Sequence, residues 1–357
     1  MPFRKPALEG FAPYVPGFQP PDAEGWVKLN TNESPFPPSP AVLRAIAAEA
    51  GYLNLYPDPE QKAFRAAAAQ AFDLGADEVV AGNGGDELLG MAVRAFVPAG
   101  SRVAVLGPTY TLMPALARIA EVEVEAHSWP ASFDGVPDSF TRSDAPLKYI
   151  CNPNSPTGTF IALEQVAALC AASPGVVLLD EAYVDFAPDS GLSILGGCPN
   201  LLLVRTMSKA YSLAGLRLGF AIANTDLMAD LWSVKESYNV GRLPLAAAVA
   251  ALMDVEYHDG CVGQIRANRA RLATELRARG WEVLEPAGNF IWGYPDGRRD
   301  AGNMDVYDAL FERKVLVRRF DIGEPGGWGY RVTIGTWDQC QALLDALDAI
   351  KAGGNRS

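Results

Sequence analysis

A regular alternation of short apolar runs with longer helical stretches, through the middle of the chain, constrains the fold more than any other feature. The runs are Arg102–Leu106, Glu121–Ala126, Leu147–Cys151, Val176–Asp180, Leu201–Arg205 and Gly219–Ala223. Helical stretches such as Thr111–Ala120 and Ala162–Ala172 separate most of them. Strands that alternate with helices form a mainly parallel sheet covered on both faces. The sequence therefore predicts an α/β fold, a mainly parallel sheet with helices on both faces.

The length of 357 residues exceeds what one hydrophobic core usually organises, so we expect more than one domain. The first forty residues are rich in proline, which favours an extended arm, and Ser39-Pro40 is a good start for a helix. A second helix is expected from Asp58-Pro59 through Phe72. The predicted divisions are an arm over 1–40, the N-terminal part of a small domain over 41–56, a large domain over 57–245, a long linking helix over 246–280 and a small α+β domain over 281–357.

The C-terminal domain is expected to mix strands and helices. Its predicted strands are Trp281–Leu284, Asn289–Tyr294, Val315–Arg318 and Tyr330–Gly335, with one helix near Met304–Arg313 and a last helix from Trp337.

Charge and cysteine usage exclude several classes of function. Forty-two acidic against thirty basic side chains give a net charge of −12, which repels phosphate backbones and anionic lipid, so neither nucleic acid nor a membrane is an expected partner. No apolar run approaches the roughly 20 residues that span a bilayer. The five cysteines are far apart, which predicts a cytoplasmic protein. His127 and His258 lack ligand spacing, so no metal is expected.

Unusual residues follow several predicted strands, at the edge where open α/β sheets bind ligands. The turn Gly82–Leu89 leads into a helix N-terminus that suits a phosphate, although an ordinary tight turn is the plainer interpretation. Asp180 ends an apolar strand and is either paired with a cation or capping a turn. Lys209 and Arg217 follow the next strand. A desolvated lysine beside other cations is a nucleophilic amine, whereas most lysines lie on the surface.

The order and spacing of these motifs resemble the fold-type I aminotransferases that depend on pyridoxal 5′-phosphate (PLP), and most closely the histidinol-phosphate aminotransferases. The resemblance runs nearly from end to end. Its segments are Pro13–Gly17, Leu29–Pro35, Tyr56–Pro59, Gly82–Leu89, Asn152–Gly158, Asp180–Tyr183, Ser208–Arg217 and Arg331–Gly335. Many members of the family have Asn immediately before Pro-Thr-Gly, where this chain has Ser155, with Asn154 one residue earlier.

This resemblance implies a role for each matching residue toward the cofactor. Lys209 would form the Schiff base and later move the substrate proton, Asp180 would hold the pyridinium nitrogen protonated, and Tyr183 would donate to the phenolate oxygen. The phosphate would be bound by Gly85, Asp86, Ser208 and Arg217, with Tyr56 reaching it from the second subunit of a homodimer. Tyr110 would stack on the ring, and either Ser155 or Asn154 would contact the phenolate oxygen.

For the substrate, the resemblance implies two arginines, Arg331 and Arg318, and a tyrosine of the N-terminal arm, Tyr14. Two arginines suit a dianion such as a phosphate, and the same site would take the carboxylate of an amino acid. Arg319 is expected to point to the opposite side of the strand. The segment Glu324–Gly329 matches no pattern of the family.

The function that the resemblance implies is transfer of an amino group between L-histidinol phosphate and 2-oxoglutarate, giving imidazole acetol phosphate and L-glutamate, in histidine biosynthesis. The expected partners are thus small amino and keto acids. Three alternatives remain: an aromatic or broad-specificity aminotransferase, a threonine-phosphate decarboxylase and a PLP-binding regulatory domain. The last is normally fused to a DNA-binding segment, and this acidic chain shows none.

Overall fold

The computed structural model describes residues 3, 9–10, 17–21 and 25–354. Its centre is a seven-stranded sheet in the order β2-β8-β7-β6-β5-β3-β4, in which β8 runs antiparallel to both neighbours and every other pair is parallel. The strands are β2 (Val79–Gly82), β3 (Arg102–Gly107), β4 (Glu123–Ser128), β5 (Leu147–Cys151), β6 (Val176–Asp180), β7 (Leu201–Thr206) and β8 (Gly219–Ile222). The prediction of a mainly parallel α/β sheet is confirmed.

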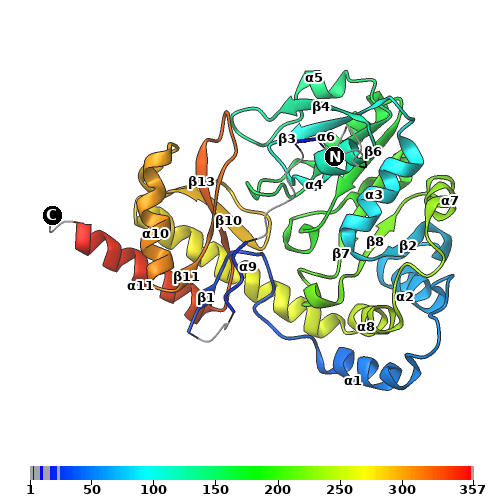
Figure 1. Cartoon of the computed structure of the whole chain (residues 1–357), viewed down its shortest axis with the longest axis horizontal. Coiled ribbons are helices and arrows are strands. Elements are labelled where there is room, and N and C mark those ends of the chain that lie inside the picture. The colour runs from blue at the N-terminus through cyan, green and yellow to red at the C-terminus, as the bar shows by residue number, and fades with distance from the viewer. Residues whose placement is uncertain (1–2, 4–8, 11–16, 22–24, 355–357) are drawn as a thin grey trace.

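Helices cover both faces of this sheet (Figure 1). On one face lie α2 (Lys62–Phe72), α6 (Leu163–Ala172) and α8 (Arg242–Met253); on the other lie α3 (Gly84–Phe96), α4 (Leu112–Ile119) and α7 (Thr225–Val234). Alternate residues of each strand belong to separate cores: Val79 packs with the first set of helices and Val80 with the second. Because both faces are covered, β2, β5, β6, β7 and β8 are buried along their whole length and are mostly apolar, whereas the edge strand β4 is partly exposed and carries polar side chains.

A smaller α+β part lies beside the large sheet (Figure 1). Its antiparallel sheet has the order β12-β13-β10-β9, and a parallel pair joins β1 to β11. The elements are β1 (Val27–Lys28), α9 (Val255–Ala278), β9 (Glu282–Val283), β10 (Phe290–Tyr294), α10 (Met304–Glu312), β11 (Val315–Leu316), β12 (Arg318–Asp321), β13 (Trp328–Thr333) and α11 (Trp337–Gly354). The N-terminal segment thus adds the short strand β1 to this part of the molecule.

The remaining helical elements are short. Among the described residues they are α5 (Asp138–Thr141) and 3-10 segments at Ala50–Tyr52, Ala76–Glu78, Val184–Phe186, Gly191–Gly197, Ala214–Leu216, Pro295–Gly297 and Ala301–Asn303.

Helix α1 (Pro40–Glu49) corrects one expectation. Ser39 caps it as predicted, since its Oγ accepts a hydrogen bond of 3.3 Å from the Val42 amide. The helix packs against α8, however, and Val42 belongs to the core of the large sheet, so residues 41–56 do not join the small domain. The physical reason is that α8 offers buried alanines, Ala247 and Ala248, against which the apolar side of α1 can approach closely.

The predicted linking helix over 246–280 is two helices, α8 and α9. Asp254 lies between them with φ −94° and ψ 59°, outside the helical region, and its carbonyl accepts the first hydrogen bond of α9 from the His258 amide.

The second helix likewise begins later than expected, at Lys62 rather than after Asp58. Here Gln61 is left-handed, with φ 54°, and the Asp58 carboxylate accepts hydrogen bonds from the amides of Glu60 and Lys62. An Asp side chain that binds the backbone competes with helix formation at this point.

Candidate active site

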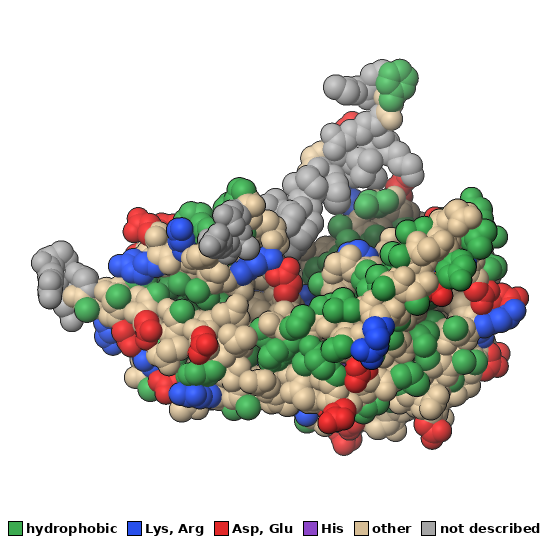
Figure 2. Space-filling model, turned by 90° about the horizontal axis from the view of Figure 1, so that it is seen from below, with side chains coloured by type: hydrophobic (Ala, Val, Ile, Leu, Met, Phe, Trp, Pro, Cys, Tyr) green, Lys and Arg blue, Asp and Glu red, His purple; other side chains and the backbone are tan. Residues whose placement is uncertain are grey.

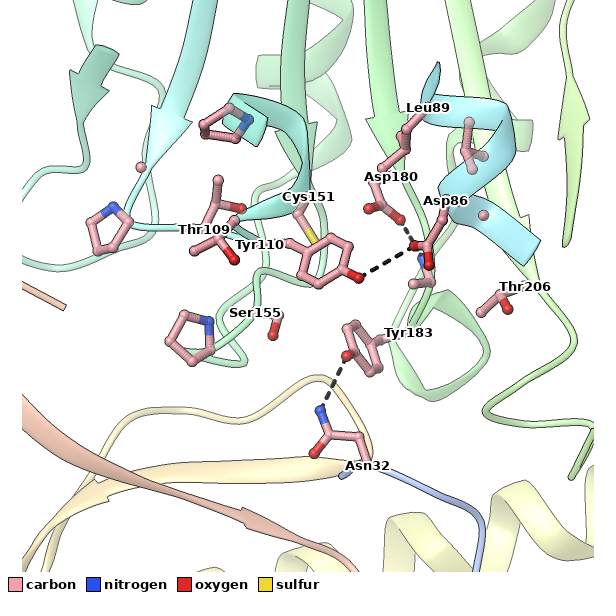
Figure 3. Close-up of a pocket in the computed structure, with 18 of the residues that line it drawn as sticks. Asn32, Asp86, Leu89, Thr109, Tyr110, Cys151, Ser155, Asp180, Tyr183 and Thr206 are labelled. Carbon is pink, nitrogen blue, oxygen red and sulfur yellow. Dashed lines mark hydrogen bonds between the residues drawn. The ribbon is translucent and has the colours of Figure 1, made fainter. Parts of the chain in front are cut away.

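A cavity of about 520 Å³ opens at the carboxyl edge of the large sheet, facing the small one (Figure 3). The last residues of four parallel strands line it: Gly107 of β3, Cys151 of β5, Asp180 of β6 and Thr206 of β7. From the smaller part of the molecule come Phe320, Ile322 and Arg331, and from the N-terminal segment Thr31 and Asn32. The site therefore lies where open α/β sheets bind ligands.

Lys209 follows β7 and lines this cavity. Its Nζ donates a hydrogen bond of 3.3 Å to the carbonyl of Thr31 and lies 5.8 Å from the centroid of the Tyr183 ring. Burial, followed by the positive charge of Arg331, lowers the pKa of this amine from 10.5 to about 7. A substantial fraction of Lys209 is therefore neutral, and nucleophilic, near neutral pH.

Asp180, the last residue of β6, is 5% exposed. One carboxylate oxygen accepts a 2.8 Å hydrogen bond from the Tyr149 hydroxyl, and the other a 3.1 Å bond from the Ala182 amide. Burial raises the pKa of Asp180 from 3.8 to about 6, although both hydrogen bonds lower it. A carboxylate that is shielded from water in this way can stabilise a positive charge placed in the cavity.

Tyr183 stands between the two halves of the site, as Figure 3 shows. Its hydroxyl accepts a 3.1 Å hydrogen bond from Asn32 Nδ2, and its ring meets Phe290 edge to face at 4.9 Å. Burial raises the pKa of the Tyr183 hydroxyl, so it keeps its proton at neutral pH and can donate a hydrogen bond to an acceptor in the cavity.

The residues predicted to bind a phosphate lie close together at the start of α3. Arg217 Nη2 lies 3.3 Å from Asp86 Oδ2, and Nη1 lies 3.4 Å from Ser208 Oγ, so these three side chains meet beside Gly85 at the cavity wall. Gly84 has φ +81°, and a Cβ there would lie 2.9 Å from Arg217 Nη2. Only glycine leaves the guanidinium this close to the helix N-terminus, where backbone amides favour an anion.

Tyr110 lines the cavity and joins the same cluster, because its hydroxyl donates a 3.3 Å hydrogen bond to Asp86 Oδ1 (Figure 3).

Of the two residues before Pro156, only Ser155 lines the cavity. Its Oγ accepts a 3.2 Å hydrogen bond from Arg331 Nη1. Asn154 is fully buried, and its Nδ2 donates to the carbonyl of Pro108 and to Thr157 Oγ1 at 3.1 and 2.8 Å. Asn154 thus holds its own loop in shape, and the structure brings Ser155, not Asn154, to the cavity.

The two predicted substrate arginines face each other on neighbouring strands. Arg318 of β12 lies directly opposite Arg331 of β13, and Arg331 lines the cavity whereas Arg318 does not. Arg319 lies on the other side of β12, as expected: its Nε donates a 2.7 Å hydrogen bond to Asn303 Oδ1 and its guanidinium covers the ring of Trp328.

Tyr56, like Asn154 and Arg318, is not among the residues that line the cavity of this single chain. The Tyr56 side chain is 77% exposed and stacks on Tyr238 at 4.5 Å. Tyr14 lies outside the described residues.

Sequence reasoning missed three side chains of the site: Asn32, Tyr149 and Phe320. Asn32 lies within the quoted segment Leu29–Pro35, but nothing there shows that its amide reaches Tyr183. Tyr149 stands in an apolar strand, and a buried tyrosine usually requires a partner, which is the signal that could have found it. Phe320 belongs to β12, a strand that was not predicted.

These residues fit an aromatic phosphate cofactor by the chemistry of their donors. Three groups line one cavity: the Lys209 amine of lowered pKa, the buried Asp180 carboxylate and the Arg217 guanidinium beside Gly84. They are complementary to a carbonyl, a ring nitrogen and a phosphate respectively. Among the described residues, no group of three or more His, Cys, Asp or Glu side chains could hold a metal ion. No helix in the described part of the chain is long and apolar enough to cross a membrane.

Comparisons with known proteins agree with this geometry. The family model "Aminotransferase class I and II" matches residues 24–347. The crystal structure of histidinol-phosphate aminotransferase from Sinorhizobium meliloti, in complex with pyridoxal 5′-phosphate, superposes with a TM-score of 0.84 at 28% identity, covering 91% of this chain and 90% of that one. Fold and site together thus define a fold-type I transferase of the PLP-dependent class.

Curated relatives narrow the assignment. The histidinol-phosphate aminotransferase of Syntrophotalea carbinolica is 40% identical over 352 residues, 97% of this chain and 98% of that protein. The enzyme of the same name from Citrifermentans bemidjiense is 38% identical over 345 residues, 96% of this chain and 97% of that protein. The chain belongs to the class I and II aminotransferases and, within them, to the histidinol-phosphate aminotransferase family.

Proposed function

We propose that the protein is a PLP-dependent aminotransferase of histidine biosynthesis, which converts L-histidinol phosphate and 2-oxoglutarate into imidazole acetol phosphate and L-glutamate, and the reverse. The observation that carries the proposal is that Lys209, Asp180, Arg217 and Arg331 line one cavity. One guanidinium would bind the phosphate of the cofactor and the other an anionic group of the substrate, with the amine of lowered pKa between them.

The cofactor would be held by the residues whose positions fit it. Gly85, the Asp86 amide, Ser208 and Arg217 would bind its phosphate, and Tyr110 would stack on its ring. When bound, PLP supplies an electron sink that stabilises negative charge at the α-carbon of the amino substrate. Asp180 supports that role by holding a proton on the ring nitrogen, because its carboxylate is buried and has no cation among its hydrogen-bond partners.

The remaining work falls to groups that bind substrate and move protons. Lys209 Nζ would act as the base that takes the proton from the α-carbon of the amino substrate and, as its conjugate acid, would give that proton back later in the reaction. Tyr183 would donate a hydrogen bond to the phenolate oxygen of the cofactor, and the Asn32 amide, which donates to the Tyr183 hydroxyl, fixes the direction of that hydroxyl. Arg331 binds the carboxylate of glutamate or the phosphate of histidinol phosphate, and Arg318 adds a second positive charge for the phosphate.

We also propose a cytoplasmic homodimer in which Tyr56 reaches the cofactor phosphate of the second copy. Hydrophobic side chains are exposed on the face seen from below in Figure 1 (Figure 2). In the segment from α1 to the second helix, Leu43, Tyr52, Leu53 and Leu55 are each more than half exposed, beside Tyr56. An apolar surface of this kind is typical of a protein interface. The five cysteines are free and buried, which fits a reducing compartment.

A half-reaction comparison tests the proposed function. The PLP-loaded protein is mixed separately with L-histidinol phosphate, L-phenylalanine and L-phosphothreonine, and the change in the cofactor spectrum is followed together with release of CO₂. We expect the highest kcat/KM with histidinol phosphate and no CO₂. A higher kcat/KM with phenylalanine would favour an aromatic aminotransferase, and CO₂ from phosphothreonine would favour a decarboxylase.

A further inference from the structure

We propose that Phe320 is a positioning residue. It would make the part of the cavity beside Arg331 and Arg318 bind a doubly charged anion in preference to a singly charged one. The inference rests on the proposed function and deepens it, since it assigns to one aromatic side chain the discrimination between phosphate and carboxylate substrates.

The argument begins with the pairing of β12 and β13. Arg318 lies directly opposite Arg331, and side chains in directly opposite positions emerge on the same face of the sheet. Like charges so placed repel each other, the more so beside a partly buried cavity. The pair therefore needs neighbours that disperse its charge and hold the two guanidiniums in position.

Phe320 is such a neighbour. It lies two residues after Arg318 on the same face, and the centroid of its ring is 5.0 Å from Arg318 Cζ and 5.4 Å from Arg331 Cζ. Both distances are within the roughly 6 Å over which a cation is attracted to an aromatic ring. One ring thus contacts both guanidiniums. Arg331 is also held by hydrogen bonds to Ser155 Oγ and to the carbonyl of Asn30, at 3.2 and 3.1 Å, so the ring links Arg318 to a guanidinium that is already in place.

The ring is itself held in place. It stacks on Trp292, which is fully buried, at 6.3 Å and an interplanar angle of 24°. The residue opposite Phe320 is Gly329, where a Cβ would lie 2.3 Å from Trp292 Cζ2. The glycine thus leaves room for Trp292 beside Phe320, and the two aromatic rings fill the space that a side chain would occupy.

The arrangement affects the two kinds of substrate differently. Arg331 and Phe320 line the cavity, whereas Arg318 does not, and the contact of both guanidiniums with Phe320 keeps Arg318 beside Arg331 at the cavity wall. A carboxylate is satisfied by one guanidinium, while a phosphate dianion has enough oxygens and charge for two. Loss of the ring should therefore weaken phosphate binding more than carboxylate binding.

The test uses PLP-loaded protein and measures binding of inorganic phosphate and of acetate by calorimetry at pH 8. We expect Phe320→Leu to weaken phosphate binding by about 3–30-fold, the range of one or two cation–π contacts, and acetate binding by less than about 2-fold. Phe320→Tyr keeps the ring and should behave like the wild type. In turnover, Phe320→Leu should raise KM for histidinol phosphate with little change in kcat.

Trp328→Leu is the matched control, because Trp328 lies on the same hairpin and its ring is 3.9 Å from Arg319 Cζ, outside the residues that line the cavity. It removes a cation–π contact of the same kind and should leave the ratio of phosphate to acetate affinity unchanged. Thermal unfolding and circular dichroism verify that each variant folds; Phe320→Met replaces the leucine variant if that one does not.

Equal weakening of phosphate and acetate in Phe320→Leu, or loss of the phosphate preference in Phe320→Tyr as well, would overturn the inference. A wild-type protein that fails to turn over histidinol phosphate, yet shows the expected order of phosphate and acetate affinities, would remove the proposed function and leave the role of Phe320 standing.

Discussion

The two walls of the cavity are built in different ways. On the side of the large sheet, Asp180 and the residues after β7 are held at the ends of buried parallel strands, with backbone and side-chain hydrogen bonds around them. On the other side, Arg318, Phe320 and Arg331 lie on one face of an antiparallel hairpin, where Phe320 contacts both guanidiniums and Arg331 also donates hydrogen bonds to Ser155 and Asn30. The first wall contains groups of shifted pKa, and the second contains clustered positive charge.

We infer from this difference that the large-sheet wall carries out the chemistry and that the hairpin wall selects the substrate. Parallel strand ends cannot move without disturbing two cores, so they suit reactive groups that must stay within a fraction of an ångström. A hairpin face can exchange side chains without disturbing those cores, so it suits the choice of substrate. If this division is right, changes on the large-sheet wall should abolish chemistry with every substrate, and changes on the hairpin should alter preference.

The largest expected effect is that of Lys209→Ala. Removing the amine should lower turnover with every substrate by about 10⁴-fold or more, the scale for loss of a catalytic nucleophile. PLP should still bind but no longer be fixed by borohydride, which mass spectrometry of the intact chain measures. Lys62→Ala, at an exposed lysine of α2, is the control. A reducible adduct at full stoichiometry in the Lys209 variant would place the attachment elsewhere.

Asp180→Ala comes next. We expect half-reaction rates to fall by about 10²–10³-fold for glutamate and histidinol phosphate alike, because the counter-charge of the ring nitrogen is lost. Stopped-flow absorbance measures both rates, and Asp226→Ala, at an exposed position of α7, is the control. Near-normal rates with the cofactor still bound would contradict the role of Asp180. An effect on one substrate only would break the division between the two walls.

The same two walls differ in how well the sequence predicts them. The strands Leu147–Cys151 and Val176–Asp180 have the predicted bounds, because strands covered on both faces are continuous apolar runs. The residues after such strands could then be assigned to one edge without further information. Glu121–Ala126 was displaced by two residues, since Glu121 adopts φ 59° in the turn that precedes β4.

The hairpin wall could not be predicted in the same way. Arg318–Asp321 contains three charged residues, and only its pairing with β13, ten residues further on, makes it a strand. The break at Asp254 and the packing of α1 on α8 likewise depend on contacts between distant segments. The choice between Asn154 and Ser155 depended on the path of one loop, which a family pattern does not specify.

Arg318→Ala tests the hairpin wall directly. Binding of histidinol phosphate should weaken by about 2–3 kcal/mol, the lower part of the range for losing one partner of a charged contact, because Arg318 is only half buried. Glutamate should be affected less, whereas Arg331→Ala should impair both substrates. KM values for the three proteins measure this. Equal losses for histidinol phosphate, glutamate and phenylalanine in Arg318→Ala would favour the aromatic aminotransferase.

The pKa shift of Lys209 predicts how the cofactor-free protein responds to pH. The folded-state pKa of about 7 is below the 10.5 of a free lysine, so between these values the unfolded chain binds more protons and stability rises with pH. Below about pH 7 the amine is charged in both states, so the full cost of burying that charge in the folded chain remains and stability no longer changes with pH through this group. Lys209→Met should therefore be more stable than the wild type at pH 7, by about 1–3 kcal/mol, and the difference should shrink toward pH 10. Urea unfolding at several pH values measures it; a constant difference would contradict the shift.

The smallest effect is expected at Tyr56, which belongs to neither wall of its own chain. Its side chain is 77% exposed, and stacking on Tyr238 leaves the hydroxyl for a contact that the proposed second copy would supply. Tyr56→Phe preserves the stacking and removes only that hydroxyl, so PLP affinity should fall by about 5-fold, the value of one hydrogen bond of about 1 kcal/mol. Tyr238→Phe is the control and should leave PLP affinity unchanged. Fluorescence titration with PLP measures both variants, and light scattering verifies that each has the same oligomeric state as the wild type. An unchanged affinity in Tyr56→Phe would mean that the cofactor site is complete within one chain, with the two walls alone.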